Sequence, residues 1–341
     1  MIISNARSVL EKAQLRRTVG LCCEMAVQVV KKASGYTGID LKLDCLLLEN
    51  RNSACFKVLG GGLANILKIN KNPGSGEVFR SVQRMEQLSS GLTVAKFSMP
   101  SVLYVDKQTD AVIMEFIDGF RLDLLLASQY RCDDLNQYIV KAAHSLSALH
   151  TVKSGLPEAA RLDTHRVEIE QLADIFPNFI ERHYRSLESL AELDESSGAV
   201  IHGDFSPKNL IYSVSGGLFF LDLTSDSLKG SPLRDLAVFK VGVARSLFSH
   251  RNLGFFNRTS RGEAFFEMFL LAYLDAVGLT ISQKNMYKNV LSLYELVRLG
   301  EMKIWLDGYE QFGERFRGRF KSVVGNYFVR ERLAELGKKL S

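Results

Sequence analysis

Residues 200–223 constrain this chain more than any other part of it. The segment begins Val-Ile-His-Gly-Asp-Phe-Ser-Pro-Lys-Asn-Leu-Ile and ends, after a turn, in Leu-Phe-Phe-Leu-Asp-Leu. It places His202, Asp204 and Asn209 in the pattern H-x-D-x4-N and puts Asp222 behind an apolar run. The proline inside the pattern disfavours a regular helix, so these residues are predicted to form a loop.

The apolar residues after this loop predict a hairpin. Leu210–Tyr212 and Leu218–Leu221 are typical of two short strands, and Ser213–Gly217 is typical of the turn between them. The hairpin would return Asp222 to the side of the loop. Isolated matches to such a pattern occur by chance, and stretches rich in Asp, Asn and Gly are usually turns. The apolar runs on both sides favour a functional site here.

These residue types suit transfer of a phosphoryl group from ATP. That reaction requires mainly positioning and neutralisation of charge. Asp204 is predicted to accept the proton of the attacking hydroxyl. Asn209 and Asp222 supply oxygen ligands of the kind that Mg²⁺ prefers.

Length and composition agree with a globular enzyme. The chain has 341 residues, of which 46% are hydrophobic and 24% charged, and it is long enough for two lobes. Its net charge of +5 suits an anionic ligand and gives no argument for a nucleic-acid partner. The five cysteines are odd in number and include no C-x-x-C motif, which indicates a reducing cytoplasm rather than a disulfide framework.

No segment is typical of a membrane span or a signal peptide. The most apolar stretch, residues 265–281, contains Glu267 and Asp275, so we expect a buried helix there and no integral membrane segment. The first residues lack the apolar core of a signal peptide. Residues 8–33 have helical spacing and predict a helical extension over residues 1–40, with a basic face that is either solvated or bound to an acidic surface.

Three antiparallel strands are predicted over residues 43–48, 54–59 and 63–69. The glycines between the last two favour a hairpin turn over a phosphate-binding loop. In a kinase the phosphate-covering loop lies between the first two strands and a lysine lies on the third. Asn50–Ser53 is therefore the predicted covering loop, with Ser53 as a nucleotide contact. Lys68 is either exposed to solvent or aimed at the phosphates, and we expect the latter.

A helix is predicted over Glu77–Ser90, where a kinase carries a glutamate that orients the strand lysine. Glu86 lies close to the apolar face of this helix, whereas Glu77 lies at its edge and in the first turn, where glutamate is common for electrostatic reasons alone. Glu86 is the preferred partner of Lys68, and Glu77 is the alternative.

A second hairpin is predicted over Val102–Val105 and Ala111–Phe116, and it runs on into Asp-Gly. Such a strand suits a connection between lobes. The backbone from Glu115 to Ile117 would then hydrogen-bond an adenine edge, with Met114 at the back of the pocket. The alternative is an ordinary core strand that ends in a turn.

The expected organisation is a nucleotide-binding lobe over residues 41–117 and a helical lobe over residues 118–341 that holds the catalytic loop and the acceptor site. His144 and His150 are interpreted as packed or capping residues. The basic run within residues 312–321 is interpreted as a solvated helix face, with anion binding as the alternative. The helices of the second lobe are predicted over residues 135–150, 168–193, 232–246, 264–277, 287–299 and 309–328.

With these parts in order, the chain resembles the aminoglycoside phosphotransferase and choline kinase-like family, which has a protein-kinase-like fold. The resemblance spans about residues 43–240. It implies an α+β bilobal fold with a small antiparallel sheet in the first lobe and helices in the second, and it implies Mg²⁺ and ATP, with GTP as the alternative donor. The glycine-rich nucleotide loop of the family is replaced here by Glu49-Asn-Arg-Asn-Ser53. The motifs that carry the resemblance are Ile66–Ile69, Val112–Gly119, Ser145–His150, His202–Leu210, Leu221–Leu223 and Leu233–Ala237.

The same resemblance implies roles for three further side chains. Asp235 would brace the catalytic loop through backbone N–H groups, and His202 would orient that loop without transferring protons. Lys208 would neutralise charge on the transferred phosphoryl group. Glycine in place of arginine between His202 and Asp204 points to the branch that acts on small molecules.

The spacing of two aspartates bears on the acceptor. Asp235 follows Asp222 by only 13 positions, which leaves little platform for an extended peptide. We therefore expect the acceptor to be a hydroxyl group of a small molecule or a glycan sugar, and the basic run near the carboxyl end favours a neutral or anionic one. The alternatives are a protein kinase-like enzyme, a nucleotide-binding pseudokinase or scaffold, and a regulatory helical protein with a coincidental motif.

Overall fold

The computed structural model divides the chain into two compact units. The first comprises Met1–Ser90 and Met99–Asp118, and the second comprises Gly91–Ser98 and Gly119–Ser341. One boundary thus falls inside the Asp-Gly pair at which the sequence predicts the connection between lobes. The structure describes residues 22–49, 53–91, 97–128, 133–152, 164–192, 198–223, 229–248, 258–311 and 317–340.

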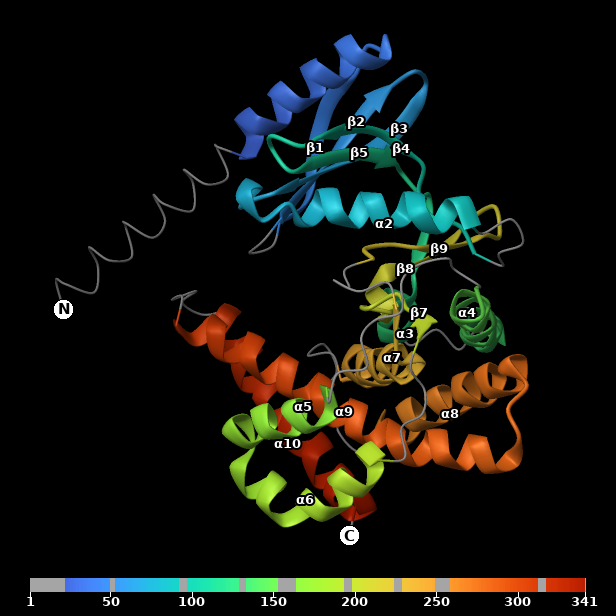
Figure 1. Ribbon diagram of the computed structural model, residues 1–341. Coiled ribbons are helices and arrows are strands. Elements are labelled where there is room, and N and C mark those ends of the chain that lie inside the picture. The colour runs from blue at the N-terminus through green and yellow to red at the C-terminus, as the bar shows by residue number, and fades with distance from the viewer. Residues whose placement is uncertain are drawn as a thin grey trace, which may run out of the picture. The chain divides into compact units, whose positions relative to one another are not determined.

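Unit 1 is built on a five-stranded antiparallel sheet with the strand order β1-β2-β3-β5-β4 (Figure 1). Its strands confirm the ranges predicted from the sequence. Gly61 and Gly62 form a two-residue turn between β2 and β3 with φ angles of 59° and 78°, a conformation that favours glycine at both positions. The glycine run is therefore a hairpin turn, as predicted. The strands are β1 (Lys42–Glu49), β2 (Ser53–Gly60), β3 (Leu63–Asn70), β4 (Val102–Asp106) and β5 (Ala111–Glu115).

Two helices cover opposite faces of this sheet, because alternate residues of a strand point to opposite sides. The helix of residues 22–37 packs on the face that contains Leu67, Ile69 and Ile113. Helix α2 (Glu77–Gly91) packs on the other face, against Val112 (Figure 1).

A carboxylate from the β4–β5 turn fixes the start of α2. Asp110 accepts hydrogen bonds from the backbone N–H groups of Val78 at 3.4 Å and Phe79 at 2.9 Å, and from the Asn70 side chain at 2.9 Å. Asp110 is fully buried and has a φ of 47°, so its backbone conformation and its capping role occur together. The turn thereby fixes α2 over the face of the sheet.

Unit 2 is mostly helical and carries two small sheets. A three-stranded sheet has the order β6-β8-β9, and a second pairs β7 with β10. The strands are β6 (Gly119–Arg121), β7 (Ala199–Val200), β8 (Leu210–Ser213), β9 (Leu218–Phe220) and β10 (Lys229–Gly230), and η2 (Pro207–Asn209) is a short 3₁₀ turn. The helices are α3 (Leu122–Ala127), α4 (Asp133–His150), α5 (Thr164–Ile175), α6 (Pro177–Glu192), α7 (Pro232–Leu247), α8 (Arg258–Val277), α9 (Ile281–Gln311) and α10 (Arg317–Leu340).

Some helix boundaries differ from the prediction. The helix expected over residues 287–299 begins earlier and runs on to Gln311, so the predicted break before residue 309 is wrong. The single helical region expected over residues 168–193 is divided into α5 and α6 at Pro177, which lacks a backbone N–H and suits the first position of a new helix.

Buried apolar residues and one buried ion network join the helices around α9. Apolar side chains of α5, α6, α7, α9 and α10 form one core cluster. Within the helical unit, Glu295 of α9 is fully buried and pairs with Lys240 of α7 at 2.6 Å and with Arg332 of α10. Burial alone would raise the pKa of the Glu295 carboxyl, but the two cations lower it overall. This network fixes α9 one turn before Arg298.

Helix α7 approaches the loop that precedes β8 very closely. A Cβ atom at Gly242 would lie 2.5 Å from Cδ of Pro207, so a larger side chain would displace either the helix or the loop.

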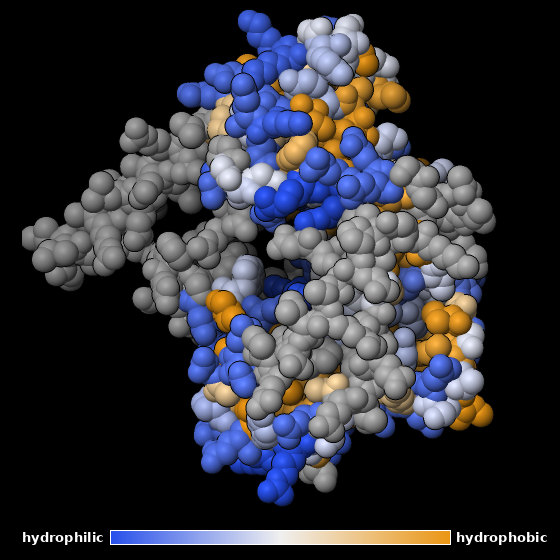
Figure 2. Space-filling view, viewed as in Figure 1, coloured by the Kyte–Doolittle hydropathy of each residue, from blue (hydrophilic) through white to orange (hydrophobic). Residues whose placement is uncertain are grey.

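None of the described helices is long and apolar enough to cross a membrane. Hydrophilic and hydrophobic residues are interspersed over the visible face of the molecule (Figure 2).

Candidate active site

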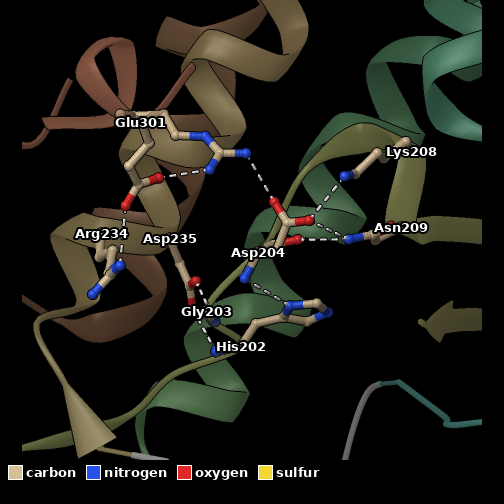
Figure 3. A network of polar contacts seen from close by, with 9 residues as sticks. His202, Gly203, Asp204, Lys208, Asn209, Arg234, Asp235 and Glu301 are labelled. Carbon is tan, nitrogen blue, oxygen red and sulfur yellow. Dashed lines mark hydrogen bonds and ion pairs between the residues drawn. The ribbon is translucent and has the colours of Figure 1, made fainter. Parts of the chain in front are cut away.

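The loop of residues 201–209 is held in place by a buried carboxylate at the start of α7. Asp235 accepts hydrogen bonds from the backbone N–H of His202 at 2.6 Å and of Gly203 at 2.8 Å (Figure 3). Gly203 has a φ of 85°, which favours glycine between the histidine and the aspartate of the motif. The bracing role expected of Asp235 is therefore confirmed.

Two further side chains complete the environment of Asp235. His150 of α4 places Nε2 3.1 Å from the Asp235 carboxylate, and its Nδ1 lies 2.7 Å from the hydroxyl of Tyr273. Burial alone would raise the pKa of Asp235, but the hydrogen bond and charge of His150 and the backbone of His202 lower it overall. His150 is buried, as its interpretation as a packed residue requires.

The His202 side chain lies inside the protein beside the loop. Its side chain is fully buried and lies edge-on to Phe205 and Phe220. The backbone N–H of Asp204 donates to His202 Nδ1 at 3.3 Å, which requires the ring proton on Nε2. Burial lowers the pKa of His202, so the ring is neutral at pH 7 and suits orientation rather than proton transfer.

Both oxygens of the Asp204 carboxylate have cationic or amide partners (Figure 3). Oδ2 accepts a hydrogen bond from Asn209 Nδ2 at 3.0 Å and lies 3.0 Å from Nζ of Lys208. Asn209 Nδ2 also donates to the backbone carbonyl of Asp204 at 2.9 Å. The structure thus brings Asp204 and Asn209 of the H-x-D-x4-N pattern together with Lys208. The Asp204 side chain is 15% exposed, which leaves the carboxylate accessible to a substrate.

A second cation, which the sequence did not indicate, contacts the other oxygen of Asp204. Arg298 of α9 places one guanidinium nitrogen 3.1 Å from Asp204 Oδ1 and another 2.7 Å from Glu301, which in turn lies 3.1 Å from Arg234 of α7 (Figure 3). Arg298 is 94 positions from Asp204 in the sequence, and no motif surrounds it. The loop around Asp204 is marked by a sequence motif, whereas Arg298 belongs to a distant helix and has no such motif.

The predicted metal ligands leave the β8–β9 hairpin at neighbouring points. The backbone N–H of Leu221 donates a hydrogen bond to the carbonyl of Asn209 at 2.9 Å. Asp222 is the next residue after Leu221, so it lies close to Asn209. Asp222 has a φ of 53°, an unusual value for a residue with a Cβ that occurs at functional sites and tight turns. One amide oxygen and one carboxylate fit Mg²⁺, which completes its coordination with phosphate oxygens and waters. Among the described residues there is no group of three or more His, Cys, Asp and Glu side chains that would hold a metal ion unaided.

In unit 1, Lys68 lies on the face of the sheet that α2 covers. It is paired across the strands with Val112, which packs against α2, while its neighbours Leu67 and Ile69 are buried on the opposite face. Lys68 is half-buried, and Glu86 and Glu77 are both exposed on α2.

The residues expected to contact adenine are placed on and just after β5. The N–H of Glu115 donates to Ser101 and the N–H of Phe116 to Ala64, so both donors are used within the sheet. Ile117, the next residue of the predicted adenine contact, is buried. Met114 packs against the cluster that joins β5 to α2.

Some expectations lie outside the described residues. Ser53 begins β2, but the rest of the predicted covering loop, residues 50–52, is not described. The same holds for the side chains of the basic run within residues 312–321 and for residues 1–21 of the predicted helical extension.

Comparisons with known structures identify the fold. The GDP and kanamycin complex of APH(2″)-IIIa matches with a TM-score of 0.63 and 14% identity, over 91% of this chain and 99% of the other. The streptomycin-ATP complex of APH(2″)-IIa gives 0.54 and 16%, over 89% and 95%. Ethanolamine kinase from Plasmodium vivax gives 0.58 and 15%, over 88% and 84%. At these identities the likeness shows a shared protein-kinase-like fold, with an antiparallel sheet in one unit and helices in the other.

The sequence comparison is more specific. No curated protein matched the sequence. The model of the phosphotransferase enzyme family matches residues 49–276, which is more than half of the chain and includes the loop with Asp204 and Asn209, the hairpin with Asp222 and the bracing Asp235. On this match and the geometry of that loop, the chain belongs to the phosphotransferase enzyme family.

Proposed function

We propose that this phosphotransferase moves the γ-phosphoryl group of Mg-ATP to a hydroxyl group of a small molecule or of a glycan sugar. The observation that carries the proposal is the arrangement around Asp204. A partly exposed carboxylate is held by Asn209 and Lys208, on a loop that Asp235 fixes through two backbone N–H groups. A site of this kind supplies a positioned base and positioned charge, which is what phosphoryl transfer requires.

In the proposed reaction Asp204 accepts the proton of the acceptor hydroxyl. The hydroxyl oxygen forms a bond to the γ-phosphorus while the bond between that phosphorus and the β,γ-bridging oxygen breaks, and the products are ADP and a phosphate ester. Lys208 lies beside Asp204 with its side chain 54% exposed, so its ammonium group can neutralise charge on the transferred group.

Asn209 and Asp222 are the proposed ligands of Mg²⁺. With its nitrogen committed to Asp204, Asn209 would bind the ion through Oδ1. When bound, Mg²⁺ neutralises charge on the phosphates of the nucleotide. The positive φ of Asp222 supports this role, because such strain persists where surrounding structure requires one orientation of a side chain.

The proposed nucleotide contacts come from unit 1. Lys68 would hold the α- and β-phosphates with Glu86 as its orienting partner, and Ser53 would contribute from the covering loop. Met114 and the backbone of Glu115 and Ile117 would enclose the base, with Ile117 as the donor. Among structural relatives, APH(2″)-IIa was solved with ATP and APH(2″)-IIIa with GDP. ATP remains the proposed donor, and the proposed location is the cytoplasm, where ATP is present and cysteines stay reduced.

A small acceptor is supported by the short connection after Asp222. Helix α7 begins at Pro232, so only residues 223–231 separate the metal ligand from the helix that braces the loop. The structural relatives include complexes with kanamycin and streptomycin and an ethanolamine kinase, whose names indicate hydroxyl-bearing small molecules. This segment leaves little room for docking an extended peptide.

Nucleotide consumption in the presence of candidate acceptors tests the proposal. The purified protein is mixed with Mg-ATP or Mg-GTP and with hydroxylated metabolites and glycans, and ADP or GDP is measured. We expect consumption that depends on an acceptor, and stabilisation by Mg-ATP of about 2–4 kcal/mol when the nucleotide is far above its Kd. Phosphate that appears only on protein would support the protein kinase alternative. Stabilisation without turnover would support the scaffold, and the absence of both would overturn the proposed function.

A further inference from the structure

The group of cations beside Asp204 points to the charge of the acceptor. We propose that Arg298 and Arg234 select an acceptor that carries a carboxylate or phosphate group in addition to the hydroxyl that is phosphorylated. This inference rests on the proposed function, because it assigns the substrate class of the same site. Arg298, Glu301 and Arg234 form a continuous chain that begins at Asp204 Oδ1 (Figure 3).

Cations outnumber carboxylates in this network. Lys208 is assigned to the transferred phosphoryl group and Asp204 to the acceptor hydroxyl, which leaves two cations, Arg234 and Arg298, against one carboxylate, Glu301. One cation is therefore not balanced once a substrate is bound at Asp204. A ligand with an anionic group would balance that charge, whereas a cationic ligand would add to it.

The side chains of this network remain accessible to a ligand. Arg298 is 28% exposed, Glu301 36% and Arg234 46%. Guanidinium groups present several N–H donors in a plane and bind carboxylate and phosphate oxygens in pairs. A charged pair at this exposure is screened by water, so a ligand oxygen can replace Glu301 at either arginine at little cost.

The contact with Asp204 links the anion to the chemistry. For its proton to pass to Oδ1, an acceptor hydroxyl must hydrogen-bond to that oxygen, either beside Arg298 or in its place. When Arg298 leaves Asp204 it keeps Glu301 as the partner of one guanidinium nitrogen, and the nitrogen that it frees can form a charge-assisted hydrogen bond with a new anionic acceptor. An anionic group on the substrate supplies that acceptor, whereas a neutral or cationic substrate does not. The site therefore discriminates against a neutral or cationic substrate, because such a substrate leaves this nitrogen of Arg298 without an anionic partner.

Two carboxylates of α8 that a cationic acceptor could use have lysine partners on α9. Glu267 pairs with Lys288 at 2.7 Å, and Asp275 pairs with Lys284 at 2.5 Å. Both pairs join α8 to α9, and each neutralises its carboxylate. Their role is therefore an ion pair between helices.

A matched set of hexoses tests the inference. Glucose, glucosamine, glucuronate and glucose 6-phosphate share a ring with free hydroxyls but differ in charge. Equilibrium binding is measured by calorimetry with Mg-ADP present, and transfer from Mg-ATP is measured separately, with ATP hydrolysis in the absence of sugar as the reference. We expect the wild-type protein to bind the anionic sugars at least tenfold more tightly than glucose or glucosamine. The two anionic sugars distinguish a carboxylate from a phosphate as the recognised group.

Variants separate anion recognition from a structural role. Arg298→Gln should weaken binding of the anionic sugar by about 10- to 100-fold, the loss of one or two charge-assisted hydrogen bonds, and raise its KM accordingly. It should change the binding of glucose far less. Glu301→Gln should have the opposite effect and tighten anion binding, because it removes the carboxylate that competes for both arginines. Arg185→Gln, the same change at an exposed site on α6, should have no effect.

The proposed function and the proposed preference for an anionic acceptor are overturned by different results. Equal binding of all four sugars, no binding of the anionic ones, or tighter binding of glucosamine would overturn the inference even if ATP is consumed. A uniform loss in Arg298→Gln across all sugars and water would also overturn it and would make Arg298 a positioning residue for Asp204. Failure of the proposed function would instead be the absence of any transfer from Mg-ATP, and the binding measurement does not depend on transfer.

Discussion

Replacement of Asp204 by asparagine should reduce turnover by roughly 10²- to 10⁴-fold, the usual contribution of a positioned general base. Asparagine is nearly isosteric, although its single side-chain oxygen can meet only one of Lys208 and Arg298. The loop should keep its shape because Asp235 holds it through the backbone of His202 and Gly203. It cannot accept a proton from a hydroxyl group. The expected result is therefore a loss in kcat at nearly unchanged affinity for Mg-ATP, measured by steady-state kinetics and by nucleotide titration.

The matched control for this change is Asp275→Asn on α8, which removes the carboxylate that pairs with Lys284 of α9 at the surface. Surface substitutions of this kind usually alter stability by less than about 0.5 kcal/mol, so turnover should remain at the wild-type level. Full turnover in Asp204→Asn would show that another group accepts the proton and would contradict the assignment of Asp204.

Replacement of Asp235 by alanine should destabilise the fold by about 3–5 kcal/mol, because it removes the charged partner from a buried set of donors. The N–H groups of His202 and Gly203 and the ring of His150 would all lose their acceptor inside the protein. Chemical denaturation monitored by circular dichroism measures the loss. Turnover should fall as well, because the loop that carries Asp204 would no longer be fixed.

Two further measurements check that the loss comes from these hydrogen bonds. Asp235→Asn keeps one acceptor oxygen and should lose clearly less stability than the alanine variant. The pKa of Asp235 is lowered in the folded protein, so its contribution is complete above the pKa of the unfolded chain, about 3.9, and is lost as the pH falls below that value. The difference between wild type and variant should therefore shrink in acid. Equal stability of wild type and Asp235→Ala at pH 7 would contradict the bracing role.

Local sequence patterns were sufficient for the elements whose residues are close in the chain. The loop around Asp204, the hairpin behind it and the helix with Asp235 follow one another within a short segment, so their spacing determined their geometry. The glycine turn between β2 and β3 was predicted for the same reason, since two positive φ angles in a two-residue turn are a local requirement.

Features that depend on distant parts of the chain were not accessible in this way. Strand β6 has only three residues and exists because it pairs with β8. Arg298 reaches Asp204 because α9 is fixed by the buried pairs of Glu295, and neither the length nor the orientation of α9 could be inferred from its periodicity. The sequence favoured a neutral or anionic acceptor only through the basic run near its carboxyl end, and the arginines on which our proposal rests could not be placed beside Asp204 from sequence patterns alone.

Titration of ATP into the Asp222→Ala and Asp204→Asn variants, with and without Mg²⁺, tests the central assignment of base and metal ligand most directly. Asp222→Ala removes a carboxylate that is proposed to hold the ion. In this variant Mg²⁺ should no longer increase the affinity for ATP, so the affinity for Mg-ATP should fall by about 10- to 100-fold. Asp204→Asn should bind Mg-ATP as the wild type does and fail only in transfer. If Asp222→Ala kept the full effect of Mg²⁺ on ATP affinity, the proposed division of roles within residues 200–223 would be contradicted.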